Sequence, residues 1–390
     1  MIGLSDESLR FGEKLASITL GIDALDRRIH SDLEDLDGLV VINMGWKDAT
    51  PFETYAEARA ALAELAKETF KLPEPDRRMY YLQACLSLDS FCAFSEGKLP
   101  SLTDQVGMFL HADCAPASEA YLKQRVAEAE AELRKLGYTG NVHDMVAEWE
   151  EKNRVPANKV KETMLSLMAE ARERTGKFLP LPEALYTCEV EEGGSFSARS
   201  DFDHLRVVVN IEPTYTLPAL KHLVVHESYP GHYMQFSLRK LYWEQGFAAA
   251  DGLLSVCNHS SSSIFEGLAD LSNRFIGWDD EPDVKVFEIL SDMKSAMGPL
   301  NSYQMHVLKW SDEQIKAYME KWPLLGGKGG IKSRLSFVRD PSRAALIWSY
   351  WRGDQAMAGV LDRVEKKDLP RFYDYIYGRL HTPASLQLFK

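Results

Sequence analysis

The sequence predicts a mainly α-helical fold with one small antiparallel β-sheet, an α+β arrangement. Three observations support this fold class. Amphipathic stretches with helical spacing, separated by proline and glycine, occupy roughly the first 175 residues. Segments with strand character follow between residues 186 and 211, and helical spacing returns from Val284 onward.

Two apolar stripes in the N-terminal half have helical spacing and are expected in the core. The first stripe consists of Tyr55, Ala58, Leu62, Leu65 and Phe70. The second consists of Val160, Met164, Leu167, Met168 and Ala171, and Gly176 follows it as a C-terminal stop.

The expected strands run from Tyr186 to Val190, from Phe196 to Ala198 and from Leu205 to Ile211. The stretch 205–210 allows two interpretations. As an edge strand it would pair main chain to main chain with an extended peptide, and as an interior strand it would pack under the next helix. That helix is expected to start after Thr216, which serves as its N-cap, with a proline in the first turn.

A glycine-rich stretch at 324–330 interrupts the helices of the C-terminal part. A phosphate-binding loop needs a Gly-Lys-Ser/Thr step, whereas here Ile331 precedes Lys332 and Ser333. A mobile surface loop that could act as a lid is therefore expected.

Composition excludes several classes of protein. Hydrophobic and charged fractions of 45% and 26% are ordinary for a globular protein, and no uncharged apolar run is long enough to span a membrane. A net charge of −13 opposes nucleic-acid binding. The start of the chain lacks a basic and then apolar leader, so a cytoplasmic location is expected. The five widely spaced cysteines favour reduced thiols.

The segment HESYPGH, from His226 to His232, carries the most chemical information. Zinc-binding helices usually place two histidines four residues apart, on one face, but here they are six apart. On an unbroken helix the second ring would lie about 240° around and about 9 Å along from the first. Pro230 and Gly231 are expected to break the helix and so allow both imidazoles to reach one metal ion.

Glu227 follows the first histidine and is expected to act as a general base toward a metal-activated water. Glu266 is the best candidate for a third ligand, which would complete a site for one zinc ion. Asp270 lies four residues later on the same helical face and could accept the second N–H of a ligating histidine. Alternative third ligands are His259, His222 and Asp270 itself.

The stretches HESYPGHYMQ and EGLA, the latter from Glu266, resemble the bacterial domain-of-unknown-function family 885. Its signature is a His-Glu-x-Tyr-Pro-Gly-His-x-x-Gln string followed by Glu-Gly-Trp-Ala, so Leu268 replaces the usual tryptophan. The resemblance covers about residues 180 to 390. It implies a mostly helical zincin fold related to thermostable carboxypeptidases.

The same resemblance implies His226, His232 and Glu266 as zinc ligands and Glu227 as the base. Gln235, the last residue of the matched string, is assigned with Asp270 to the immediate surroundings of the ligands. The Glu-x-x-x-Asp pair is also similar to that of thermolysin-type peptidases.

The segment from Ser349 to Gly353 is similar to the family's Ala-Tyr-Lys-x-Gly segment, and Tyr350 is the first choice for stabilising an oxyanion. Tyr229, His306 and Arg352 are the alternatives. A carboxypeptidase also needs a cation for the substrate's carboxylate. Its candidates are Arg206, Arg334, Arg339, Arg343 and Arg352. Of all these residues, Arg206, Arg352 and His306 are assigned to substrate binding.

Together these observations predict one catalytic unit over residues 1–390, with a helical lobe at 1–178 and a zincin-like lobe at 179–390. The expected function is zinc-dependent, carboxypeptidase-like hydrolysis of a small peptide or peptide-like amide. A ferrous oxygenase with a two-histidine, one-carboxylate site and a binding protein without catalysis are the alternatives. The oligomeric state does not follow from the sequence.

Overall fold

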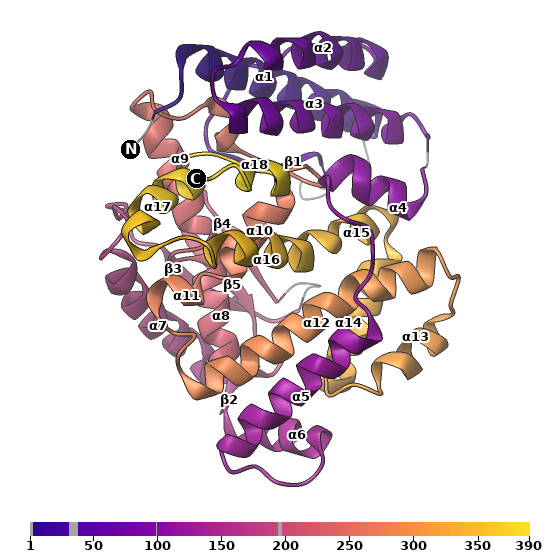
Figure 1. The fold of residues 1–390 in the computed structure, drawn as a ribbon, viewed down its shortest axis with the longest axis vertical. Coiled ribbons are helices and arrows are strands. Elements are labelled where there is room, and N and C mark those ends of the chain that lie inside the picture. Colours follow the sequence, from indigo (N-terminus) through magenta and orange to yellow (C-terminus); the bar gives the residue numbers. More distant parts are fainter. Residues whose placement is uncertain (1–2, 31–37, 99, 194–196) are drawn as a thin grey trace. The chain divides into compact units, whose positions relative to one another are not determined.

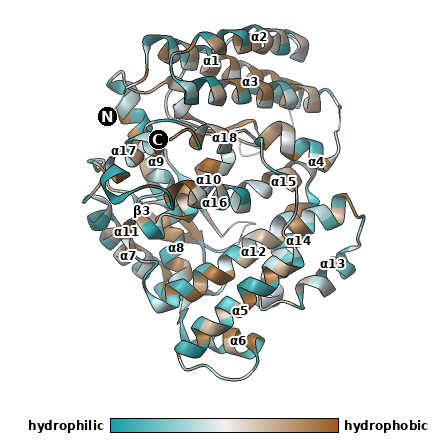
Figure 2. Cartoon of the chain, in the orientation of Figure 1, coloured by the Kyte–Doolittle hydropathy of each residue, from teal (hydrophilic) through white to brown (hydrophobic). Residues whose placement is uncertain are grey.

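The computed structural model describes residues 3–30, 38–98, 100–193 and 197–390. It is 64% helical and contains small β-sheets, which confirms the mainly α fold class. Hydrophobic and hydrophilic residues alternate along its helices (Figure 2), as expected for helices with one buried face. Within the described residues, no helix is both long enough and apolar enough to cross a bilayer.

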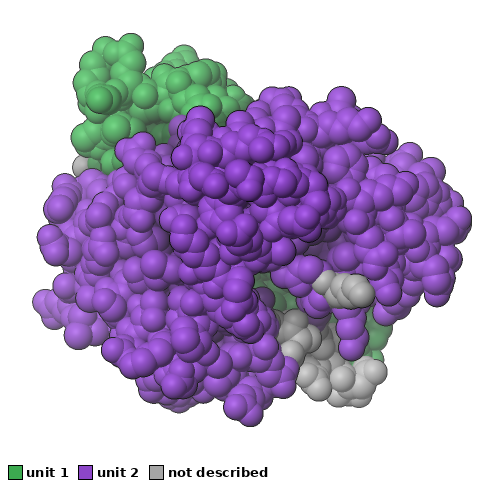
Figure 3. Space-filling model, turned by 90° about the horizontal axis from the view of Figure 1, so that it is seen from below, with its two compact units in different colours: residues 1–114, 235–268, 348–390 green, residues 115–234, 269–347 purple. Residues whose placement is uncertain are grey.

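The chain folds into two compact units, each made of segments that are distant in sequence (Figure 3). Unit 1 comprises residues 1–114, 235–268 and 348–390, and unit 2 comprises residues 115–234 and 269–347. This division differs from the predicted boundary at residue 178. The division falls inside two continuous helices, α9 (His232–Glu244) and α10 (Ser262–Asp270).

Unit 1 is helical apart from one short antiparallel strand pair. Besides most of α9 and α10 it contains α1 (Asp6–Ile29), β1 (Val40–Asn43), α2 (Tyr55–Glu68), α3 (Pro75–Ser95), α4 (Leu102–Gln105), the π-helix η3 (Val106–Leu110), β7 (Leu254–Val256), α16 (Trp348–Leu361), α17 (Leu369–Gly378) and α18 (Pro383–Leu386). Strand β1 pairs with β7. Helices α1, α2 and α3 pack against one another (Figure 1).

The core of unit 1 includes four of the five residues of the first predicted stripe. Tyr55, Ala58, Leu62 and Leu65 are buried between the helices. Phe70 is 74% exposed, so its assignment to the core was wrong. The reason is that α2 ends at Glu68, and Phe70 follows in a short 3₁₀ turn that does not continue the helical face.

A contact between two glycines sets the distance between α10 and α16. A Cβ built on Gly353 would lie 1.9 Å from the carbonyl oxygen of Ser263, and one on Gly267 would lie 2.3 Å from the carbonyl carbon of Gly353. Neither position can hold a larger residue without moving a helix backbone. The glycine of the EGLA stretch is therefore needed for the close approach of α10 and α16.

Unit 2 contains helices and a small sheet. Its elements are α5 (Glu119–Lys135), α6 (Val142–Lys152), β2 (Arg154–Val155), α7 (Val160–Thr175), β3 (Thr187–Glu191), β4 (Ala198–Asp201), β5 (Arg206–Asn210), β6 (Tyr215–Thr216), α8 (Leu217–Glu227), α11 (Asn273–Ile276), α12 (Pro282–His306), α13 (Asp312–Met319), α14 (Gly327–Arg339) and α15 (Pro341–Leu346). The second predicted stripe is buried on α7, which ends at Gly176 as expected.

The predicted sheet is present, but its strand pairing is mixed. The strand order is β3-β5-β4, with β5 parallel to β3 and antiparallel to β4. Strand β5 is the interior strand, and four of its five residues are buried. This decides between the two interpretations of residues 205–210, because the edges of the sheet are β3 and β4. Of the predicted strand 196–198, residue 196 lies outside the described part of the chain, and the observed strand β4 begins only at Ala198.

Two predicted helix boundaries have different outcomes. Thr216 caps α8, since its side chain accepts the N–H of Ala219, and Pro218 lies in the first turn as expected. The predicted loop at 324–330 was wrong, because α14 starts at Gly327. Gly326 has a φ of 74° and donates its N–H to the carboxylate of Glu150, a tertiary contact that the sequence does not reveal.

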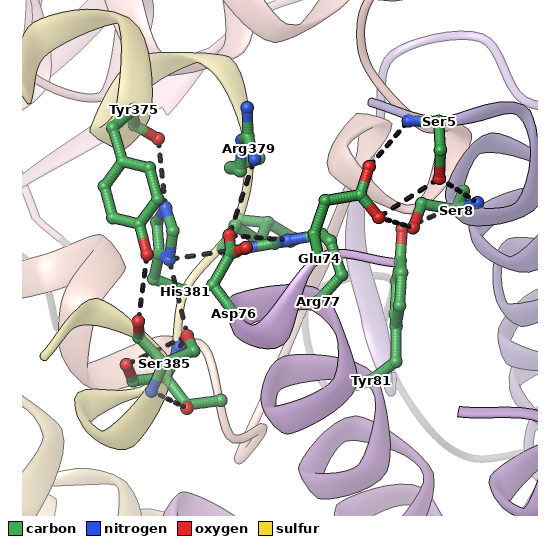
Figure 4. A network of polar contacts seen from close by, with 12 residues as sticks. Ser5, Ser8, Glu74, Asp76, Arg77, Tyr81, Tyr375, Arg379, His381 and Ser385 are labelled. Carbon is green, nitrogen blue, oxygen red and sulfur yellow. Dashed lines mark hydrogen bonds and ion pairs between the residues drawn. The ribbon is translucent and has the colours of Figure 1, made fainter. Parts of the chain in front are cut away.

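A buried polar network fixes the C-terminal segment of unit 1 to α3 (Figure 4). Arg77, which is 1% exposed, bonds Asp76 at 3.1 Å and the Leu380 carbonyl at 2.8 Å. Arg379 lies 3.4 Å from the same carboxylate. Burial alone would raise the pKa of Asp76, but the charges of Arg77, His381 and Arg379 outweigh it and lower the pKa to about 2.

Replacing Arg77 by methionine should lower the free energy of unfolding by about 3 kcal/mol or more, because a buried carboxylate loses its principal partner. Urea denaturation followed by circular dichroism measures this loss. The matched control is Arg10→Met on α1, where the side chain is exposed. Equal stability of the two variants would contradict the role assigned to Arg77.

Candidate metal centre

The helix that carries the first histidine is broken where the sequence predicts. Helix α8 ends at Glu227 and α9 begins at His232, so residues 228–231 form a tight connection. The Tyr229–Pro230 peptide bond within it is cis. The two histidines therefore lie at facing helix ends, with His226 in the last turn of α8 and His232 at the first position of α9.

Gly231 allows this connection to be short. A Cβ built on it would lie 2.0 Å from the carbonyl oxygen of His226 and 2.1 Å from that of Val225. The start of α9 thus packs directly on the last carbonyls of α8. The φ of Gly231 is not in the left-handed region, so close packing is the reason why glycine is needed at this position.

The two imidazoles converge as predicted. Their ring centroids are 4.5 Å apart, with the planes at 77°. The Nδ1 atom of His226 donates to Oδ1 of Asp270 over 2.7 Å. Because Nδ1 is used in this hydrogen bond, the opposite nitrogen, Nε2, is the atom with which His226 would bind a metal ion.

Two groups of side chains could hold a metal ion. One is His226, His232 and Glu266, and the other is His222, His226 and Asp270; within each group the ligand atoms all lie within 4.8 Å of one another. In the second group, Nε2 of His222 is 3.3 Å from Oδ1 of Asp270. Two ligands of one tetrahedral zinc ion lie about 3.3 Å apart, so the 2.7 Å between His226 and Asp270 is too short for shared ligation. Asp270 thus orients the two histidines.

Electrostatics support that role for Asp270. Burial would raise the pKa of its carboxyl group, but the charge of His226 and the hydrogen bonds from His222 and His226 hold the pKa well below its usual range. Asp270 is therefore ionised at neutral pH and keeps the Nδ1 proton on His226. Asp270 therefore lies where it was expected, as the acceptor of the second N–H of a candidate histidine ligand.

Glu266 is fixed by α10. Glu266 lies one helical turn before Asp270 on the same face of α10. The hydrogen bond between Asp270 and His226 therefore also places Glu266 near the histidines. Gln235, one turn after His232 on α9, is fully buried and donates to the carbonyl of Phe265, at 3.1 Å. That bond connects α9 to the residue preceding Glu266. Both predicted neighbours of the ligands therefore position ligand-bearing helices.

Glu227 receives a hydrogen bond that the sequence did not indicate. Ser200, on strand β4, donates its Oγ proton to Oε2 of Glu227 over 2.7 Å. Ser200 lies 27 positions upstream of Glu227. No motif connects the two residues, so only the packing of β4 on α8 reveals the contact.

The other predicted residues have partners of their own. Tyr350 lies on α16, one turn before the close-packed Gly353. Arg206 pairs with Asp201, Arg352 bonds both the carbonyl and the carboxylate of Asp113, and His306 bonds the Val338 carbonyl. The hydroxyl of Tyr229 is close to the backbone N–H of Tyr186, from which it accepts a bond. His259 belongs to neither metal-binding group of the described residues.

The donor set suits a divalent transition metal. Two imidazole nitrogens and one carboxylate oxygen leave open coordination positions, which is typical of catalytic zinc and ferrous sites. The hydrogen bond from His226 to a carboxylate is the usual support of a metal-binding histidine. We conclude that the chemistry of these residues fits such an ion.

Comparisons with known proteins show only the fold. No protein-family model matches the sequence, and no curated protein matches it. A candidate lipoprotein from Colwellia psychrerythraea has a similar structure, with a TM-score of 0.55, 16% identity and 84% of this chain covered. A candidate lipoprotein of unknown function from Shewanella oneidensis is similar as well, with a TM-score of 0.51, 13% identity and 85% of this chain covered. The chain spans 65% and 70% of those proteins' lengths.

Gly231→Ala should weaken Zn²⁺ binding at least tenfold, because the added methyl group would push α9 away from the carbonyls of α8 and separate the two imidazoles. Calorimetric titration with zinc measures the affinity. Gly359→Ala is the control, since its Cβ would meet no atom within 4 Å. Unchanged affinity in Gly231→Ala would show that the close packing is not needed.

Asp270→Asn should lower zinc affinity by about 10- to 100-fold, because an amide orients the ligating histidine less firmly than a carboxylate. A competition titration with a chromogenic chelator gives the dissociation constant. Asp203→Asn, at an exposed position, should leave it unchanged. An equal loss in both variants would indicate a general charge effect.

Proposed function

We propose that the protein is a zinc-dependent hydrolase that cleaves a peptide or peptide-like amide bond. One observation supports this most directly. The ligand atoms of His226, His232 and Glu266 lie within 4.8 Å of one another. Glu227 directly follows His226 and is the last residue of α8. A hydrolase needs this combination of a metal-binding triad and a nearby base.

Each residue then has a defined task. A zinc ion, when bound by His226, His232 and Glu266, supplies Lewis-acid activation of water and of the scissile carbonyl. Glu227 takes a proton from the attacking water as its oxygen adds to the carbonyl carbon. The C–N bond then breaks, and Glu227 returns the proton to the departing amine. Ser200 holds one carboxylate oxygen of Glu227 and so fixes its orientation.

Tyr350 remains our proposed donor to the oxyanion. Its helix, α16, packs on α10 through Gly353 and Gly267, and Gly267 directly follows Glu266. A phenol on this helix can donate to charge that develops on the carbonyl oxygen. The similarity of residues 349–353 to the family 885 segment supports the same assignment.

A peptide-like substrate is supported by the position of β4. In the described part of the chain β4 pairs with β5 alone, so its outer edge offers backbone groups to an extended chain. Ser200 on this strand contacts Glu227. A main chain bound along β4 would therefore lie beside the proposed base. Together with the HESYPGHYMQ and EGLA stretches, this supports kinship with family 885 and a carboxypeptidase-like activity.

The ligand set alone also suits a ferrous oxygenase. The carboxylate of Glu227 beside the ligand His226 favours hydrolysis, because a general base serves water activation more directly than oxygen activation. Metal analysis of anaerobically purified protein, combined with oxygen-uptake measurements, separates the two functions.

Glu227→Gln should retain zinc and lower turnover by about 10²- to 10⁴-fold, because the amide cannot accept the proton of water. A peptide library digested with and without a chelator, and read by mass spectrometry, first identifies a substrate. Metal content and turnover are then measured for the variant. Glu192→Gln, exposed after β3, is the control. Full activity in Glu227→Gln would refute the proposed mechanism.

A further inference from the structure

Lys294 is a partly buried cation whose nearest acidic group, Glu150, acts on it by charge and makes no direct ion pair with it in the described residues. It lies in the middle of α12, which packs against α5 and α14 in unit 2 (Figure 1). Within the described residues its ammonium group makes no hydrogen bond and no ion pair. A cation partly removed from water is costly unless an anion or other acceptors replace its hydration.

A second cation lies one helical turn away. The guanidinium of Arg334, on α14, lies over Gly298, where a built Cβ would be 3.2 Å from its Nη1. Gly298 follows Lys294 by four residues, so both occupy one face of α12. The acidic group whose charge reaches Lys294 is Glu150, and its carboxylate accepts the N–H of Gly326. Lys294 and Arg334 therefore lie near each other, and the nearby carboxylate of Glu150 is already hydrogen-bonded to Gly326.

Burial and the charge of Arg334 lower the pKa of Lys294 to about 8, and Glu150 only partly opposes them. At neutral pH the ammonium group is therefore still mostly protonated. Its surroundings nevertheless disfavour the positive charge of the ammonium group, and a bound anion would stabilise that charge.

The same face of α12 leads to the candidate metal centre. Phe287 lies two turns before Lys294, and its ring centroid is 5.4 Å from that of His222. His222 in turn bonds Asp270, which holds the ligand His226. Two helical turns correspond to about 10 Å. Lys294 thus lies about 10 Å along α12 from the residue that contacts His222, a length comparable to a few residues of an extended peptide.

We propose that Lys294, with Arg334 beside it, binds a carboxylate of the substrate at a short distance from the bond that is cleaved. This inference rests on the proposed hydrolase function and narrows its substrate to acidic or carboxyl-terminal peptides and similar amides. It also supplies the cation that Arg206 and Arg352 do not offer, since these pair with Asp201 and Asp113. Lys294 was not among the residues that the sequence singled out.

Calorimetric titration of the zinc-loaded chain with N-benzoylglycine and with its amide tests the proposal. The acid should bind at least tenfold more tightly than the amide, because only the acid carries the carboxylate. Lys294→Met should abolish this preference, whereas Lys285→Met, an exposed position on the same helix, should retain it. Lys294→Gln gives a second neutral variant if the methionine variant does not fold.

Two outcomes would overturn the proposal: an unsubstituted chain that binds acid and amide equally, or a folded Lys294 variant that keeps the preference. Inorganic phosphate binding as tightly as the acid, and competing with it, would also overturn it, because it would show an unselective anion site. Zinc content is measured on every sample. Loss of the preference with zinc retained bears on Lys294 alone, whereas absence of zinc binding in the unsubstituted chain refutes the hydrolase function.

Discussion

The packing of Gly231 on the last carbonyls of α8 is the constraint on which the candidate site depends. Two histidines six residues apart cannot share an ion on a regular helix. Here α8 ends and α9 starts within four residues, which is possible only because no side chain separates Gly231 from Val225 and His226. The rings come within 4.5 Å, and every further feature of the site is built around this pair.

Asp270 connects this pair to the rest of the site. By accepting the Nδ1 proton of His226 it selects the tautomer that presents Nε2, and by its place on α10 it positions Glu266 one turn earlier. Gln235 makes the complementary bond from α9 to the Phe265 carbonyl. The three helices that carry candidate ligands are therefore joined by hydrogen bonds of residues adjacent to the site, which is how a metal centre obtains precise geometry from ordinary helices.

The proposed chemistry draws on elements that are distant in sequence. Strand β4 brings Ser200 to Glu227, and its outer edge pairs with no other strand of the described residues. On helix α12, Phe287 lies next to His222, and Lys294 follows two turns later on the face that Arg334 contacts at Gly298. A substrate with an extended main chain and a carboxylate would use both features. The scissile bond would then lie between a backbone-binding edge and a cationic anchor, which favours one orientation of the peptide.

Local patterns in the sequence determined the helical fold, the small sheet, the cap at Thr216 and the convergence of His226 and His232, because each depends on residues close together in the chain. The tertiary structure decided what depends on distant residues. It made β5 the interior strand, started α14 at Gly327 through Glu150, and left Phe70 exposed after α2. It also brought Ser200 to Glu227 and Arg334 to the face of α12 that carries Lys294, since neither contact has a signature in local spacing or residue type.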